Sequence, residues 1–131
     1  MRFLLDTSIF LWGPTNPERL NRRAQEILGS GREDLSLSAA SVWEIAIKYQ
    51  LGKLRLPEPP VVYIPSRLGV SGIRALEITH LHAMNAGELP LHHQDPFDRM
   101  LIAQARLEGM TLLTADRVFE KYAVEMIWCG A

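Results

Sequence analysis

The chain has 131 residues, of which 47% are hydrophobic and 22% charged, with a formal net charge of −1. These ordinary values exclude a disordered chain, and the length excludes two independent hydrophobic cores, so a single domain covering residues 1–131 is expected. Cys129 is the only cysteine, which excludes an intramolecular disulfide or a thiolate zinc cluster and favours a reducing, cytoplasmic setting.

Neither a secretory signal nor a membrane span is expected. Asp6 follows only three apolar residues, whereas a signal needs an apolar stretch of roughly 7–15 residues. No stretch approaches the roughly 18–20 apolar residues of a transmembrane helix. The near-neutral charge carries no basic signature of nucleic-acid binding, although a dense acidic site can offset basic residues elsewhere on the surface.

Short apolar runs alternate with segments of helical spacing along the chain. A run of a few apolar residues bounded by turn residues predicts a strand, and apolar residues three and four apart predict a helix. The expected elements in chain order are a strand at 2–5, a helix beginning at 6–8, a proline-rich turn around 14–17, a polar helix at about 18–28 ended by Gly29 and Gly31, a strand at 35–37, an amphipathic helix at 39–51, a loop with one short helix in 53–72, a strand at 73–78, a helix at 79–86 closed by Gly87, a helix capped by Asp95 and ended by Gly109, a strand at 110–113, a short helix opened by Asp116, and a strand at 124–128.

This alternation predicts an α/β domain, with a parallel sheet of about five strands and helices on both faces. In such sheets ligands bind beyond the carboxyl ends of the strands, near the point where the strand order reverses. Asp6 directly follows the first expected strand, and Asp116 lies just past the fourth. The two acids are expected at the same edge of the sheet if those strands are neighbours.

Four carboxylates stand out, although each has a simple structural explanation. Asp6 and Asp116 suit helix N-caps, Glu44 suits a surface pair with Lys48, and Asp98 suits the first turn of its helix. Their placement argues for more. Asp98 precedes the apolar Leu101 and Ile102 by three and four residues, and Glu44 lies among apolar neighbours, so neither is expected to be fully solvated.

Converging carboxylates require a counter-charge. At roughly 5 Å and an effective dielectric near 20, each ionised pair repels by about 3 kcal/mol, while a whole domain is stable by only about 5–15 kcal/mol. Such a cluster takes up protons or binds a cation. An oxygen-only ligand set suits Mg²⁺ or Mn²⁺.

Other functional side chains have simpler roles. His80 and His82 do not face the same way on a helix, and His92 and His93 lack a third spaced ligand, so no histidine metal site is expected. The tryptophans, which are Trp12, Trp43 and Trp128, are expected to pack at least half-buried rather than to stack on RNA. The basic residues that suit phosphate contacts, each more simply explained as solvated surface charge, are Arg22, Arg23, Lys53, Arg55, Arg99 and Arg117.

Four strings resemble PIN domains in their order and spacing: LLDTS, SAASVWEIAIK, DPFDRMLIAQA and LLTAD. Across nearly its whole length the chain is similar to the VapC-like toxins of bacterial toxin–antitoxin pairs. The resemblance implies a metal-dependent ribonuclease that cleaves single-stranded RNA, often within a structured RNA such as tRNA or rRNA. It also implies a homodimer held inactive by a small antitoxin protein, for which the docking groove is expected near Tyr49 and Leu54.

The resemblance also assigns roles to particular residues. Asp6, Glu44, Asp98 and Asp116 match the metal-binding acids of the family, and Thr7 and Thr114 match hydroxyl positions near the metal. Asp95 is expected to support the site as an N-cap, with Arg99 as a further partner of its carboxylate.

Two alternatives remain at this point. A receiver domain of a two-component system also combines an α/β fold with acids at strand ends and Mg²⁺, but here the first strand ends in a single Asp rather than an acidic pair. A PIN-like module that binds without cutting is disfavoured because all four acids are present. Incubation with single-stranded RNA and Mg²⁺ or Mn²⁺, with and without a chelator, separates the three readings.

Overall fold

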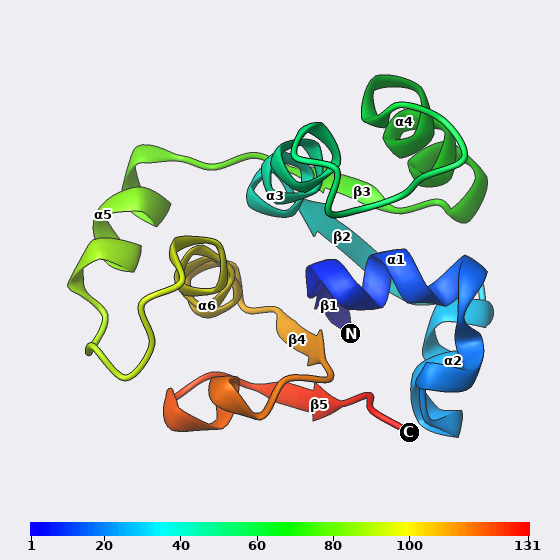
Figure 1. The fold of residues 1–131 in the computed structure, drawn as a ribbon. Helices are drawn as coiled ribbons and strands as arrows, with labels where there is room; N and C mark the ends of the chain where they lie inside the picture. The colour runs from blue at the N-terminus through cyan, green and yellow to red at the C-terminus, as the bar shows by residue number, and fades with distance from the viewer.

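Five parallel strands form the centre of the molecule in a computed structural model that describes residues 1–131 (Figure 1). The strand order is β3-β2-β1-β4-β5, so β1 is central and the order reverses there. Leu4 pairs with Ser36 of β2 on one side and with Leu112 of β4 on the other. The strands are β1 (Arg2–Leu5), β2 (Asp34–Ser38), β3 (Arg74–Leu76), β4 (Thr111–Thr114) and β5 (Met126–Trp128).

This strand order excludes the receiver-domain alternative. Receiver domains have the order 2-1-3-4-5, in which the chain changes direction between the first and third strands. Here the chain runs outward from β1 through β2 to β3 and then returns to the other side of β1 as β4. The switch point therefore lies between β1 and β4. Because these strands are neighbours, Asp6 and Asp116 lie at the same edge of the sheet.

Helices cover both faces of the sheet. In Figure 1, α1 and α2 lie on one side and α5 and α6 on the other. The helices are α1 (Thr7–Thr15), α2 (Arg22–Gly29), α3 (Ala39–Gln50), α4 (Pro60–Ser71), α5 (His80–Glu88) and α6 (Pro96–Glu108), with short 3-10 helices η1 (Pro17–Arg19) and η2 (Arg117–Lys121). None of them is long and apolar enough to cross a membrane.

Two hydrophobic clusters hold the layers together, because alternate residues of a strand point to opposite faces of the sheet. Phe3 and Leu5 of β1 join the cluster beneath α1, α2 and α4. Leu4, between them, joins the cluster beneath α6. Both faces are thus buried, and the central strand β1 carries a continuous apolar run, Phe3–Leu5, as is usual for parallel sheets.

Several element boundaries differ from expectation. The predicted turn at 14–17 is wrong in part: α1 continues to Thr15 with Pro14 in its last turn. The predicted helix at 18–28 is divided into η1 and α2, because Asn21 caps α2 by accepting a hydrogen bond from the amide of Ala24. The one helix expected in 53–72 is the 12-residue α4, which begins at Pro60 and contains Pro65.

The predicted strand at 73–78 is also too long, because only Arg74–Leu76 pairs with β2. Gly87 lies within α5 instead of closing it. By contrast Gly109 ends α6 as predicted, with a positive φ of 65° that glycine adopts without strain.

Candidate metal centre

An open cleft of about 630 Å³ lies at the carboxyl ends of β1 and β4. All four predicted acids line it, together with Asp95 and two basic side chains. The polar and charged lining residues are Asp6, Thr7, Ser8, Glu44, Lys48, Asp95, Asp98, Asp116 and Arg117.

The topology explains why acids so distant in sequence meet there. Asp6 and Asp116 follow β1 and β4, which are neighbours in the sheet. Glu44 lies on α3, which starts directly after β2. Because α6 runs back to the start of β4, its first turn lies at the same edge and carries Asp98 into the cleft.

Asp6 is the most deeply buried acid of the cleft, with 7% of its surface exposed. Its Oδ1 accepts a hydrogen bond from the amide of Thr7 (2.8 Å), and its Oδ2 accepts one from the hydroxyl of Thr114 (2.7 Å). Burial raises the pKa of Asp6 to about 7, with the charges of Asp98 and Glu44 acting in the same direction and the two hydrogen bonds opposing them. The carboxylate is held in position, yet its negative charge is poorly stabilised.

Glu44 is buried (9% exposed) and receives two hydrogen bonds. The Thr7 hydroxyl donates to Oε1 (2.7 Å), and the Lys48 ammonium lies 2.6 Å from Oε2. The ion pair with Lys48 that a simple surface role predicts is therefore formed, but it lines the cleft. The bond to Glu44 raises the pKa of Lys48, so this ammonium remains charged beside the acids.

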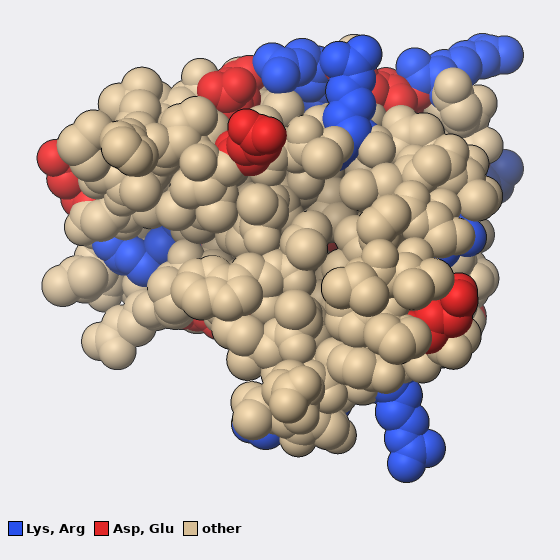
Figure 2. Space-filling model, turned by 90° about the horizontal axis from the view of Figure 1, so that it is seen from above, with Lys and Arg blue, Asp and Glu red and all other residues tan.

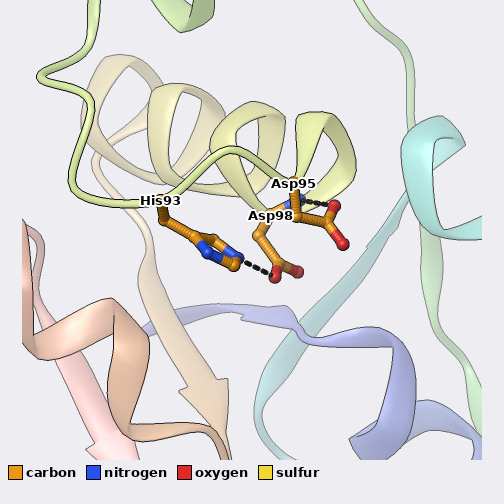
Figure 3. Close-up of side chains that lie close together, drawn as sticks. All are labelled: His93, Asp95 and Asp98. Carbon is orange, nitrogen blue, oxygen red and sulfur yellow. Dashed lines mark hydrogen bonds and ion pairs between the residues drawn. The ribbon is translucent and has the colours of Figure 1, made fainter.

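Asp98 and Asp95 lie at the start of α6 and have different partners (Figure 3). Asp95 is the N-cap, as predicted: its Oδ1 accepts from the amides of Phe97 (2.8 Å) and Asp98 (3.1 Å). Asp98 Oδ2 lies 2.7 Å from Nε2 of His93. Burial raises the pKa of Asp98 to about 6, a shift to which the charges of Asp95 and Glu44 add and which the hydrogen bond to His93 opposes.

His93 is the residue of the site that sequence reasoning missed. His93, Asp95 and Asp98 offer ligand atoms within 4.8 Å of one another. Spacing along the chain does not predict it, because no third ligand follows His93 at a regular interval and its loop takes a path that depends on distant contacts. The one available signal is its position five residues before Asp98, on the segment leading to the Asp95 cap.

Asp116 is an exposed N-cap at the rim of the cleft. Its Oδ1 accepts from the amide of Val118 (3.0 Å), and its own amide donates to the Thr114 hydroxyl (3.0 Å). Thr114 thus bridges Asp6 and the backbone of Asp116, just as Thr7 bridges the cap of α1 and Glu44. Both threonines lie at the site, where the PIN resemblance places hydroxyls.

The role expected for Arg99 is wrong. Its side chain is 7% exposed and lies under the α5–α6 loop, so it is neither solvated nor able to contact a phosphate. It makes no bond to Asp95, whose Oδ1 is already engaged by two amides. Instead its guanidinium donates to the backbone carbonyl of Ala86 in α5 and to those of Leu89, Pro90 and His93 in the loop.

The tryptophans also differ from one another. Trp43 is 63% exposed, which corrects the expectation that it packs, although its ring meets Phe97 edge-on at 5.4 Å. Trp12 and Trp128 are half-buried, and Trp128 carries the guanidinium of Arg117 over its ring at 3.8 Å from the centroid. Arg117 is therefore held at the rim beside Asp116.

The donor set fits a hard divalent cation. The cleft offers carboxylate oxygens from four segments of the chain, and Asp98 Oδ1 and Asp116 Oδ2 have no protein partner. The raised pKa values of Asp6 and Asp98 show that the protein alone does not neutralise this charge. Oxygen donors of this kind favour Mg²⁺ or Mn²⁺ over Zn²⁺.

Known proteins resemble this chain in sequence and in fold. The PIN domain family model matches residues 3–125. Ribonuclease VapC22 of Mycobacterium tuberculosis is 29% identical over 115 residues, which cover 87% of this chain and 86% of the relative. Ribonuclease VapC16 of the same organism is 51% identical over 51 residues, which cover 39% of this chain and only 36% of the relative.

Solved structures show the same fold. VapBC2 from Rickettsia felis, bound to a DNA fragment from its promoter, aligns with a TM-score of 0.71 at 17% identity, covering 98% of this chain and 99% of the other. FitAcB from Neisseria gonorrhoeae aligns with a TM-score of 0.68 at 23% identity, covering 95% and 96%. At these identities the likeness concerns the fold alone.

Proposed function

The chain belongs to the PIN domain family, and from this premise we propose that it is a Mg²⁺- or Mn²⁺-dependent endoribonuclease that cleaves single-stranded RNA. The observation that carries the proposal is the convergence of Asp6, Glu44, Asp98 and Asp116 on one open cleft. The relatives named as ribonucleases, VapC22 and VapC16, support the same reaction class.

In this proposal the four acids hold the metal, and Thr7 and Thr114 fix two of them. A bound ion would orient and deprotonate water and stabilise the charge that develops during phosphoryl transfer. Asp6 and Glu44 are rigid because each carboxylate oxygen has a hydrogen-bond donor. Lys48 and Arg117, the two basic side chains that line the cleft, pair with Glu44 and Glu120. In this proposal they also contact RNA phosphates.

We further propose that the protein is the toxin of a type II toxin–antitoxin pair, acting in the cytoplasm, and that it forms a homodimer. Solved neighbours include toxin–antitoxin complexes. Figure 2 shows a face whose middle is mostly free of charged side chains, which gather toward its edges. Large apolar side chains exposed on the protein include Trp43, Leu51, Val61, Val62, Val70, Leu81, Met84 and Leu91.

The decisive experiment compares the wild type with Asp6→Asn on single-stranded RNA. Cleavage is expected with Mg²⁺ or Mn²⁺, and it should stop when EDTA is added. Asn keeps the volume of Asp6 but removes the charge, so the variant should fold and lose most of the cleavage. Equal cleavage by both proteins, or cleavage that survives EDTA, would contradict the proposal, and no cleavage by either would favour a binding module.

A further inference from the structure

The loop between α5 and α6 is tied around a buried guanidinium. Arg99 Nη1 donates to the carbonyls of Pro90 (3.0 Å) and His93 (3.1 Å), and Nη2 donates to those of Ala86 (2.9 Å) and Leu89 (2.9 Å). A buried charge without such bonds is strongly destabilising. The loop therefore has to follow the path that keeps these carbonyls around Arg99.

Tyr122 fixes the same loop from another part of the chain. Its hydroxyl donates to the Pro90 carbonyl (2.7 Å) and accepts from the amide of His93 (3.0 Å). Both backbone polar groups of His93 are thus engaged, the amide by Tyr122 and the carbonyl by Arg99. This leaves little freedom in where the His93 side chain begins.

The imidazole of His93 is directed at one carboxylate oxygen of the cleft. Its Nε2 lies 2.7 Å from Asp98 Oδ2, and Figure 3 shows the two side chains pointing toward each other. Nε2 carries the proton when the carboxylate is ionised, because a carboxylate only accepts. Asp98 Oδ1 has no protein partner, so it is the oxygen left for other ligands of the cleft.

We propose that His93 is a positioning residue for Asp98. Arg99 and Tyr122 hold the α5–α6 loop in the path that brings the His93 imidazole to the Asp98 carboxylate. The inference rests on the proposed metal-dependent function, in which Asp98 is a ligand. A hydrogen bond to the outer oxygen of a ligating carboxylate fixes its orientation, and losing such a bond typically lowers metal affinity about 10–100-fold.

A direct role of His93 as a metal ligand fits the geometry less well. The three ligand atoms of His93, Asp95 and Asp98 do lie within 4.8 Å. However, Nε2 of His93 faces Asp98 Oδ2, and Asp95 Oδ1 accepts hydrogen bonds from two amides. Hydrogen bonds already account for the closeness of this group.

The first test measures Mn²⁺ affinity by calorimetry in His93→Ala, His93→Gln and the control His80→Ala, whose side chain is exposed at the start of α5. We expect His93→Ala to weaken binding about 10-fold or more. His93→Gln should recover most of the loss, because its amide nitrogen can donate from a similar position, and His80→Ala should bind as the wild type does. Thermal unfolding in EDTA should show all variants folded.

The second test asks whether Tyr122 acts through His93. Tyr122→Phe removes only the hydroxyl and should weaken Mn²⁺ binding, whereas the double variant with His93→Ala should bind no more weakly than His93→Ala alone. Additive losses of Mn²⁺ affinity in the double variant would contradict a role of Tyr122 that acts through His93. A pulsed EPR spectrum in which Mn²⁺ couples to a directly bound imidazole nitrogen would overturn the positioning role.

Failure of this inference differs from failure of the proposed function. Unchanged Mn²⁺ affinity in His93→Ala, with a wild type that binds Mn²⁺ and cleaves RNA, overturns the positioning role alone. A wild type that binds no Mn²⁺ overturns both.

Discussion

At the scale of single residues, the dominant feature is a carboxylate that the protein buries without neutralising. Burial raises the pKa of Asp6 to about 7 from an ordinary value of 3.8, even though Thr7 and Thr114 donate hydrogen bonds to it. The folded protein therefore binds a proton at Asp6 more tightly than the unfolded chain does. Burial also raises the pKa of Asp98, to about 6, so the folded protein binds a proton more tightly there as well.

Stability without metal should consequently fall as pH rises. The contribution of Asp6 to the free energy of unfolding is fully present below about pH 4, where the carboxyl is protonated in both states. It is lost as pH rises through about 7, because the folded protein then releases a proton that the unfolded chain gives up at lower pH. We expect the free energy of unfolding in EDTA, measured with urea at pH 5 and pH 8, to decrease less in Asp6→Asn than in the wild type. Asp34→Asn, which changes a partly exposed acid paired with Arg74, is the control and should behave as the wild type.

At the scale of elements, the start of α6 carries an N-cap acid, Asp95, and an acid that we propose as a metal ligand, Asp98. Asp95→Ala removes the N-cap and should cost about 0.5–2 kcal/mol of stability while leaving measurable RNA cleavage. Asp98→Asn should abolish cleavage with little loss of stability, since its carboxylate caps nothing. Urea unfolding and a cleavage assay on both variants check this. The reverse pattern, an active Asp98→Asn and a stable but inactive Asp95→Asn, would show that the two roles are exchanged.

The same element shows what local sequence rules can and cannot predict. The cap at Asp95, the end at Gly109 and the buried stripe of Leu101 and Ile102 follow from neighbouring residues, and the structure has all of them. The position of His93 depends on backbone contacts with Arg99 and with Tyr122, which lies 29 residues beyond it. Such a contact leaves no periodic signal. The partners of Arg99 are backbone carbonyls, which every residue has, so no sequence pattern distinguishes this buried arginine from a surface one.

The helix starts were likewise more predictable than the lengths of the elements. Asp6 and Asp116 are N-caps, as predicted, and both also line the cleft, while their role as metal ligands stays a prediction. The prolines in 53–72 predict a loop with one short helix, yet α4 has 12 residues, and Pro60 lies at its start, where its missing N–H costs nothing. Further along that helix, Tyr63 and Ile64 pack in the core.

At the scale of the whole molecule, the exposed apolar side chains bear on assembly. Leu81 and Met84, three residues apart on α5, and Val61 and Val62 on α4 are exposed enough to lie within an interface. We expect a dimeric mass in light scattering, and a lower mass when the residues of at least one pair are both replaced by Glu. A monomer at all concentrations, without an antitoxin that co-purifies from the native operon, would contradict the proposed assembly.

Metal binding should also couple to the stability of the entire fold. The acids of the cleft lie just after β1, on α3, at the start of α6 and just after β4, so an ion held among them connects four parts of the chain that meet only in the folded state. An ion that binds only the folded protein stabilises it by about 2.7 kcal/mol at 100 times its Kd, which for a domain of this size raises Tm by several degrees. The effect should be larger at pH 8 than at pH 5, because the raised pKa values of Asp6, about 7, and Asp98, about 6, leave both acids largely protonated at the lower pH. Thermal unfolding with a series of Mn²⁺ concentrations at the two pH values measures this, and Asp98→Asn should reduce the shift at pH 8. An equal shift at both pH values, or an undiminished shift in Asp98→Asn, would place the ion outside the cleft.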